Sequence, residues 1–183
     1  MTVSELVRGQ PAEKLARIFG PIAPSHTECI SVGRSRWPYL VSRDPWAAGV
    51  AYHNLLLRWG DEKPFTKGEA AYYGWMKAMR TALRRGRSPR FHVEVPMTWG
   101  DYHGRCDIAI GGKGLAEVKV SDCPAEKPRA KDVGQLAIYC AGLKAEYGAL
   151  VYVQLREQKV VVHWFFKGAV LVKGAGEMIH GRN

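Results

Sequence analysis

Three side chains in the middle of the chain have the types and the spacing of a hydrolytic site. Asp107 lies in a short run of alternating residues, and Glu117 and Lys119 lie two apart in the next such run. Residues two apart in an extended strand project from the same face, so Glu117 and Lys119 point the same way. A turn centred near residues 112–113 brings position 107 close to position 117 across a hairpin. The pattern therefore predicts two carboxylates and an ammonium group side by side.

This mixture of groups suits the hydrolysis of a phosphodiester. Carboxylates hold one or two Mg²⁺ ions, which polarise the phosphate and lower the pKa of water. A nearby lysine can orient that water or stabilise the charge that develops on the phosphate. The alternative is a cross-strand salt bridge on the surface, worth only about 0–1 kcal/mol. An Asp with Glu-x-Lys leaves both interpretations open.

The elements that must position these residues can be predicted from periodicity and turn residues. Strands are predicted over residues 91–95, 106–110, 115–120, 149–155 and 159–166, the last two as a hairpin. Tight turns are expected at 99–102 and 111–114, and a helix over 131–146. The expected fold class is α/β, in the α+β form of a central mixed β-sheet flanked by helices.

The first half of the chain is predicted to be mainly helical. Helices are expected over residues 11–19, 44–59 and 66–86, with residues 21–43 as loop or irregular structure. In the second helix, Trp46, Val50, His53 and Leu57 fall at spacings of four, three and four, which predicts one apolar face with a histidine in it. Such a histidine is usually a satisfied core residue.

Four short motifs together resemble those of the PD-(D/E)XK nucleases, and specifically the RecB-like branch. The matching segments are Gly49 to His53 (GxxxH), Gly104 to Asp107, Glu117-Val118-Lys119 (ExK) and Gln135 to Tyr139 (QxxxY). Gln135 and Tyr139, four apart in a helix, share a face. Each motif is loose by itself, but their order and spacing agree over roughly residues 45–165.

The resemblance implies a restriction-endonuclease-like core and a role for each matching residue. His53, Asp107, Glu117 and the backbone carbonyl of Val118 would bind Mg²⁺ or Mn²⁺, and Lys119 would be the catalytic lysine. Gln135 and Tyr139 would contact substrate or brace the site, although both could be ordinary helix surface and core. Glu94, in the strand before Asp107, would bind a second metal or support the first.

A positive charge favours nucleic acid as the partner. The chain carries 27 Lys and Arg against 17 Asp and Glu, and neutralisation of phosphates by such residues drives binding to nucleic acid. Between Glu69 and Glu94 there is no acidic residue, so this basic segment is a candidate for contacts with the DNA backbone, against the alternative of a solvated face. The candidate residues are Arg80, Arg84, Arg85, Arg87 and Arg90, with Arg34 and Arg36 in the earlier loop.

Other features limit the cofactors and the setting. The cysteines at 29, 106, 123 and 140 form no CxxC pair and lack the spacing of related iron–sulfur nucleases, so packing residues and no iron–sulfur cluster are expected. No apolar run is long enough for a bilayer and no signal peptide is evident, which predicts a cytoplasmic, intracellular protein and no membrane partner. No ATP-binding motif is present, so any unwinding would need a separate helicase or recombination protein.

The sequence thus predicts one nuclease domain over residues 1–183: a helical part to about 90, a sheet core with the QxxxY helix over about 91–166, and a short tail. The expected activity is metal-dependent cleavage of single- or double-stranded DNA, as an exonuclease or an endonuclease, in recombination, repair, phage DNA processing or defence. A non-catalytic nucleic-acid-binding module on a degenerate nuclease fold is the main alternative. An RNA endonuclease or a site-specific restriction enzyme is the third.

Overall fold

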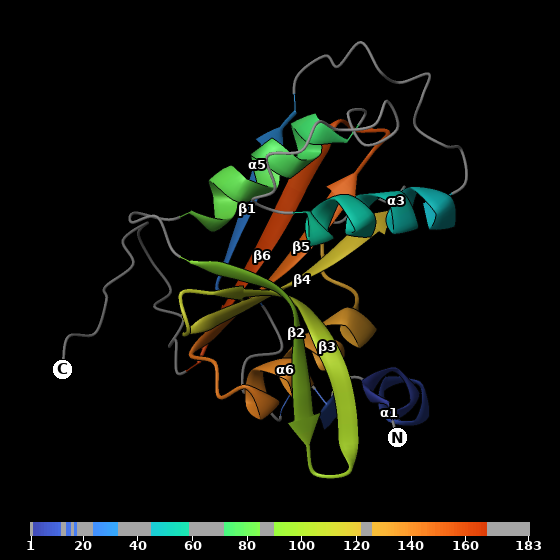
Figure 1. The fold of residues 1–183 in the computed structure, drawn as a ribbon, viewed down its shortest axis with the longest axis vertical. Coiled ribbons are helices and arrows are strands. Elements are labelled where there is room, and N and C mark those ends of the chain that lie inside the picture. Colours follow the sequence, from blue (N-terminus) through green and yellow to red (C-terminus); the bar gives the residue numbers. More distant parts are fainter. Residues whose placement is uncertain are drawn as a thin grey trace, which may run out of the picture.

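A six-stranded sheet forms the centre of the structure, a computed structural model that describes residues 2–11, 14–15, 17, 24–32, 45–58, 72–84, 90–121 and 126–167 (Figure 1). The strands are β1 (His26–Ser31), β2 (Phe91–Trp99), β3 (Tyr102–Ile110), β4 (Gly114–Ser121), β5 (Tyr147–Gln154) and β6 (Lys159–Phe166). Their order across the sheet is β1-β6-β5-β4-β3-β2. The β4–β5 pair is parallel and the other neighbouring pairs are antiparallel, so the sheet is mixed.

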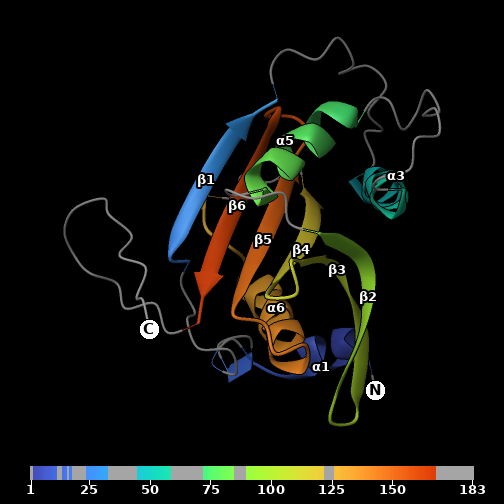
Figure 2. The same cartoon turned by 60° about the vertical axis from the view of Figure 1, so that its left-hand side comes forward.

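Helices cover both faces of this sheet. The described helices are α1 (Val3–Gly9), α3 (Pro45–Leu57), α5 (Tyr73–Leu83) and α6 (Ala130–Gly142). Figure 2 shows α3 and α5 on one side of the strands, and α6 with α1 on the other. α6 connects the parallel strands β4 and β5, which cannot be joined by a tight turn.

The alternation of side chains along β5 and β6 divides the hydrophobic core into two layers. Ala149, Val151 and Val153 are buried under α3 and α5, whereas Leu150 and Tyr152 are buried under α6. Strands covered on both faces are apolar at nearly every position, as β5 and β6 are. β5 and β6 are therefore packed on both faces, and the neighbouring strand β4 carries the polar residues Glu117 and Lys119.

The sheet opens between β3 and β4. Their ladder contains only the pairs Ile108–Ala116, Ala109–Leu115 and Ile110–Gly114, next to a turn in which Gly111 and Gly112 have positive φ. β4 instead continues along β5 as far as Ser121. The β2–β3 hairpin diverges from the rest of the sheet beyond this point (Figure 1). The predicted register is confirmed, because continuation of the ladder by one pair would place position 107 opposite 117.

The predicted mixed sheet flanked by helices is confirmed, while two elements were missed. β1 lies in the 21–43 segment expected to be loop, and it pairs with β6 at the sheet edge. Its sequence contains too few apolar residues to mark a strand, and it is exposed at alternate positions. α1 begins with a capping box of Thr2 and Glu5, a signal that the sequence does contain. β2 and β3 are also longer than predicted and meet at the expected turn.

The predicted apolar face of α3 is wrong. Ala48, Tyr52, Leu55 and Leu56 are buried, whereas Val50 and Leu57 are 43% and 52% exposed. Apolar residues occur all around this helix, so periodicity does not distinguish the buried face from the outer one.

Several predictions lie outside the described residues. These are the first residue of the helix expected over 44–59, residues 66–71 of the helix expected over 66–86, most of the 11–19 helix, and the side chains of Arg34, Arg36, Trp46, Arg85 and Arg87. Among the residues that are described, no helix has both the length and the apolar character needed to cross a bilayer.

Candidate active site

Asp107 occupies the fork where β3 separates from β4. Its carboxylate Oδ2 accepts a hydrogen bond of 2.6 Å from the backbone N–H of Val118, so a side chain takes the position of the missing ladder partner. Asp107 is 8% exposed. A charged hydrogen bond to a backbone donor fixes the carboxylate in one orientation. The same bond fixes the position of the Val118 N–H. The role of the Val118 carbonyl as a metal ligand stays a prediction.

Glu117 and Lys119 project from β4 toward α6, as their spacing predicts. Lys119 Nζ donates to Glu117 Oε1 at 2.8 Å and to Gln135 Oε1 at 2.9 Å. Gln135 Nε2 in turn donates to the same Glu117 oxygen at 2.8 Å and to the Tyr139 hydroxyl at 3.3 Å. The structure therefore brings the ExK and QxxxY residues into one hydrogen-bonded network, in which Gln135 holds both members of the ion pair.

His53 approaches this group from α3. Its Nδ1 lies 3.5 Å from Asp107 Oδ1, and the histidine side chain is 34% exposed, so the ring is only partly buried. The ligand atoms of His53, Glu94 and Asp107 all lie within 4.8 Å of one another. Imidazole and carboxylate groups at this spacing can share a divalent cation. Three elements thus supply this group: α3 supplies His53, β2 supplies Glu94 and β3 supplies Asp107.

The backbone is unusual at Glu94. It has φ of 52°, and the β2–β3 pairing passes from Val93–Ile108 to Val95–Cys106 without an assigned pair at this position. A non-glycine residue in the left-handed region costs about 1–3 kcal/mol, and such residues concentrate at functional sites. Glu94 also lies 3.7 Å from the exposed Arg105 guanidinium. The strained position puts a third carboxylate beside Asp107.

Burial makes the two central carboxylates poor anions without a cation. Desolvation raises the pKa of Glu117 from its ordinary value of 4.5 to about 8, and the nearby Asp107 charge adds to this while Lys119 opposes it. Desolvation also raises the pKa of Asp107, to about 6, against the lowering effect of its bond from Val118. A bound cation would reverse both shifts because it favours the ionised forms.

The basic groups are shifted by the same surroundings. Burial lowers the pKa of His53, which keeps the imidazole neutral and able to bind a metal, although the Glu117 charge opposes this. Burial also acts to lower the pKa of Lys119, but the charge and hydrogen bond of Glu117 outweigh it and the pKa is raised. Lys119 is therefore a cation, suited to stabilising negative charge rather than to removing a proton.

Within the part of the chain that the structure describes, one carboxylate oxygen of Glu117 lacks a hydrogen-bond partner, which bears on whether the site could bind a metal. Glu117 Oε2 is buried and has no hydrogen-bond partner among the described residues, while Oε1 accepts two bonds. A buried carboxylate oxygen without a partner is costly, and binding of an ion is one of the usual reasons for it. The His53, Glu94 and Asp107 group is a donor set of the kind that holds Mg²⁺ or Mn²⁺. Glu117, which the sequence predicts as a ligand, is not a member of this group, so its binding to a metal stays a prediction.

The site opens into a cavity of about 570 Å³ between α3, β4 and the start of α6. His53, Glu117 and Lys119 line it, together with Gly49 and Val50 of α3. Arg129 also lines it and was not among the residues predicted from the sequence. No periodicity or motif marks this arginine, because it precedes α6 in a short connecting segment.

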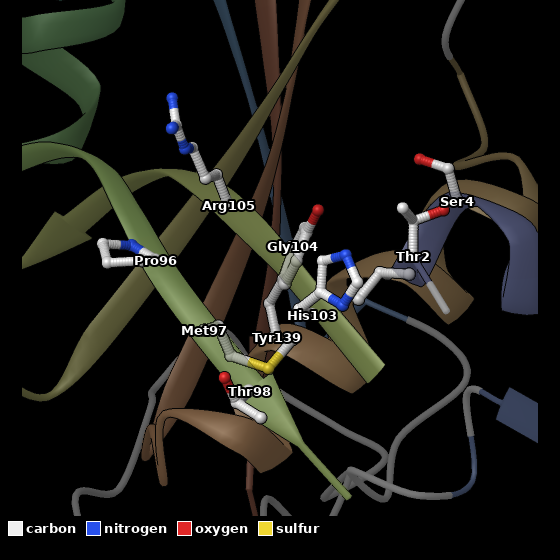
Figure 3. A pocket seen from close by; sticks show the side chains of 10 residues that line it. Thr2, Ser4, Pro96, Met97, Thr98, His103, Gly104, Arg105 and Tyr139 are labelled. Carbon is white, nitrogen blue, oxygen red and sulfur yellow. The ribbon is translucent and has the colours of Figure 1, made fainter. Parts of the chain in front are cut away.

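Tyr139 links the network to a second cavity, of about 470 Å³, beside the start of α1 (Figure 3). Figure 3 shows Tyr139 beside Gly104 and Met97, with His103 directed toward Thr2. A Cβ atom at Gly104 would lie 3.0 Å from Tyr139 Cε1 and 3.2 Å from its hydroxyl. Gly104 therefore makes room for the tyrosine.

The described arginines of the predicted DNA-binding segment lie apart from the cavity lining. Arg80 and Arg84 are on or next to α5, which packs mainly against β6 and β1. Arg90 is exposed at the start of β2, and its carbonyl accepts a bond from Gly111 in the neighbouring turn. Their contact with DNA stays a prediction.

Comparison with solved structures found likenesses at low identity. SSO0001 is 21% identical, with a TM-score of 0.39, and the match covers 56% of this chain and 51% of that one. An alkaline exonuclease from Laribacter hongkongensis, LHK-Exo, is 12% identical over 70% of this chain and 73% of its own, with a TM-score of 0.40. Its complex with dAMP matches at 14% identity over 86% and 83%, with the same TM-score.

No protein-family model matches the chain, and no curated protein matches it. The function is therefore argued from the geometry of the site.

Proposed function

We propose that this chain is a metal-dependent nuclease of the PD-(D/E)XK type, in the RecB-like branch, that hydrolyses DNA. The observation that supports it is the meeting of Glu117 and Lys119 of β4 with His53 of α3 in the lining of one open cavity, with Asp107 of β3 next to His53. The Gln135–Tyr139 pair supports the same assignment because it contacts this network rather than facing solvent.

Each residue has a role that follows from its surroundings. His53, Asp107, Glu94 and the unpartnered oxygen of Glu117 would hold Mg²⁺ or Mn²⁺. When bound, the cation supplies charge that polarises a phosphodiester and makes water more acidic. Lys119, a partly buried cation held by Glu117 and Gln135, stabilises the negative charge that develops on the phosphate. In the hydrolysis, the oxygen of water forms a bond to phosphorus as the bond from phosphorus to the leaving oxygen breaks, and the leaving oxygen takes up a proton.

The direct test measures cleavage by the purified protein on end-labelled linear DNA, circular DNA, single-stranded DNA and an RNA of equal length. Mg²⁺, Mn²⁺ and EDTA are compared. Cleavage that needs the metal supports the proposal. Comparison of the linear and circular substrates distinguishes an exonuclease, which needs a DNA end, from an endonuclease, which does not. Stable DNA binding without cleavage under any of these conditions would favour the non-catalytic binding module instead.

The chain contains a matched control for the Glu117–Lys119 pair. Lys113 and Glu146 form an ion pair of 3.1 Å whose side chains are 67% and 64% exposed, against 22% and 4% for Lys119 and Glu117. Lys119→Ala should abolish cleavage and leave the fold intact, and Asp107→Ala should do the same. Lys113→Ala should leave the rate unchanged. Equal rates for the two lysine variants would reduce Lys119 to an ordinary ion-pair residue.

A further inference from the structure

Arg129 is held in a closed ring of hydrogen bonds at the edge of the site cavity. Its backbone N–H donates to the Tyr152 hydroxyl at 3.0 Å, and that hydroxyl donates to Asp132 Oδ2 at 2.7 Å. Arg129 Nε donates to the same Asp132 oxygen, also at 2.7 Å. Both the backbone and the side chain of Arg129 are thus fixed by the same two partners.

The two partners are buried while the arginine is not. The Asp132 side chain is 4% exposed and Tyr152 is 1% exposed, whereas the Arg129 side chain is 45% exposed. The guanidinium carbon also lies 5.6 Å from the centre of the Tyr152 ring. Burying a carboxylate has a desolvation cost that an ion pair at the surface does not have. Here the buried carboxylate fixes the direction of a half-exposed cation.

The arginine has donors to spare for a ligand. The bond to Asp132 uses Nε, one of the five N–H donors of the guanidinium, and leaves the four on the Nη nitrogens. Arg129 lines the same cavity as Glu117, Lys119 and His53. A planar guanidinium matches the geometry of phosphate oxygens, and a preset orientation lowers the entropy lost on binding.

We propose that Arg129 binds a phosphate of the substrate strand next to the one that is cleaved, and that Asp132 and Tyr152 act as positioning residues for it. The inference deepens the proposed nuclease function and rests on it. The ligand is the phosphodiester backbone, so the contact carries no base information and should be the same on every sequence.

The first experiment measures binding of a labelled duplex in EDTA, where cleavage is prevented, as a function of salt. Arg129→Ala should weaken binding about 10- to 100-fold. It should also lower the slope of log affinity against log salt by about 0.9. Lys131→Ala removes an equal charge from the exposed start of α6, outside the cavity lining, and should change neither. Equal effects of the two variants would overturn the proposal.

The second experiment tests whether Asp132 acts through Arg129. Asp132→Ala should weaken DNA binding, and adding Arg129→Ala to it should cause no further loss. Asp132→Asn keeps an acceptor oxygen and should restore most of the affinity. Independent, additive losses would mean that Asp132 has only a structural role, and thermal unfolding of each variant shows whether it is folded.

Failure of this inference and failure of the proposed function can be told apart. Wild-type protein that binds DNA through Arg129 but does not cleave it in Mg²⁺ or Mn²⁺ would overturn the nuclease function alone. The inference alone would be overturned if the wild type cleaves DNA while Arg129→Ala and Lys131→Ala have the same DNA affinity and the same cleavage rate.

Discussion

Gln135 donates a hydrogen bond of 2.8 Å to the carboxylate of Glu117, although 18 positions separate them in the chain. Its amide oxygen accepts from Lys119 at 2.9 Å, so one side chain joins both members of the buried ion pair. An amide can do this because it offers a donor and an acceptor at once. Leucine or glutamate at this position could not satisfy both groups.

The first prediction concerns this bridge. Gln135→Leu should lower the free energy of unfolding by about 1–3 kcal/mol, because the buried carboxyl group of Glu117 and the partly buried ammonium group of Lys119 each lose a partner. Cleavage should fall at least about tenfold, since Lys119 is no longer held in one orientation. Tyr139→Phe removes only the 3.3 Å bond and should have a smaller effect on both. Unchanged cleavage by Gln135→Leu would make Gln135 an ordinary helix residue.

The second prediction is a pH dependence of stability. Burial raises the pKa of Glu117 from 4.5 to about 8, so the folded protein holds this proton more tightly than the unfolded chain does. The contribution of Glu117 to stability is therefore fully present below pH 4.5 and is lost as pH rises toward about 8. Without metal, the melting temperature of wild type should therefore fall more between about pH 5 and about pH 9 than that of Glu117→Gln. The exposed Glu146→Gln serves as control and should fall as wild type does.

Addition of Mn²⁺ to the wild type should recover stability at the higher pH, because a cation favours the ionised carboxylate and binds only the folded site. Glu117→Gln should gain less. Parallel falls for wild type and Glu117→Gln in the metal-free scan would mean that this carboxylate is not destabilised by burial.

The third prediction concerns the metal ligands. His53→Ala should lower Mn²⁺ affinity, measured by titration calorimetry, at least about tenfold. The Mg²⁺ affinity should fall less, because imidazole suits the softer cation. The melting temperature should change little since the His53 ring is one-third exposed. A large loss of stability with unchanged metal binding would restore the core-histidine interpretation.

Glu94→Gln provides the companion test, because it keeps the shape of the side chain and removes its charge. If Glu94 is a ligand in the His53 and Asp107 group, this change should lower the affinity for both cations. A variant with wild-type metal affinity but slower cleavage would instead make Glu94 a supporting residue.

The fourth prediction concerns the basic segment before β2. Changing Arg84, Arg85 and Arg87 together to alanine should weaken DNA binding on every sequence and flatten its salt dependence by up to about 0.9 log units per lost duplex phosphate contact. Metal binding should be unaffected. If the salt slope does not change, these arginines are plain surface charge, and Arg34 and Arg36 become the better candidates.

Local relationships at the site could be predicted from the sequence. The same-face placement of Glu117 and Lys119 follows from strand geometry, and the approach of Asp107 to Glu117 follows from the glycine turn, since hairpin register depends on loop length. The pairing of Gln135 with Tyr139 follows from helical periodicity. Each of these depends on residues close in the chain, where backbone geometry alone limits the choices.

Other relationships were decided only by tertiary packing. The polar strand β1 forms because β6 offers it an open edge, and the buried face of α3 is chosen by the sheet beneath it. Glu94 reaches Asp107 through a strained backbone, and Arg129 is oriented by Tyr152, 23 positions away. Contacts between distant segments depend on how whole elements pack, so they cannot be predicted from the periodicity of residues along one segment. The sequence by itself therefore determined that Asp107, Glu117 and Lys119 lie close together, and the tertiary structure decided which residues surround them.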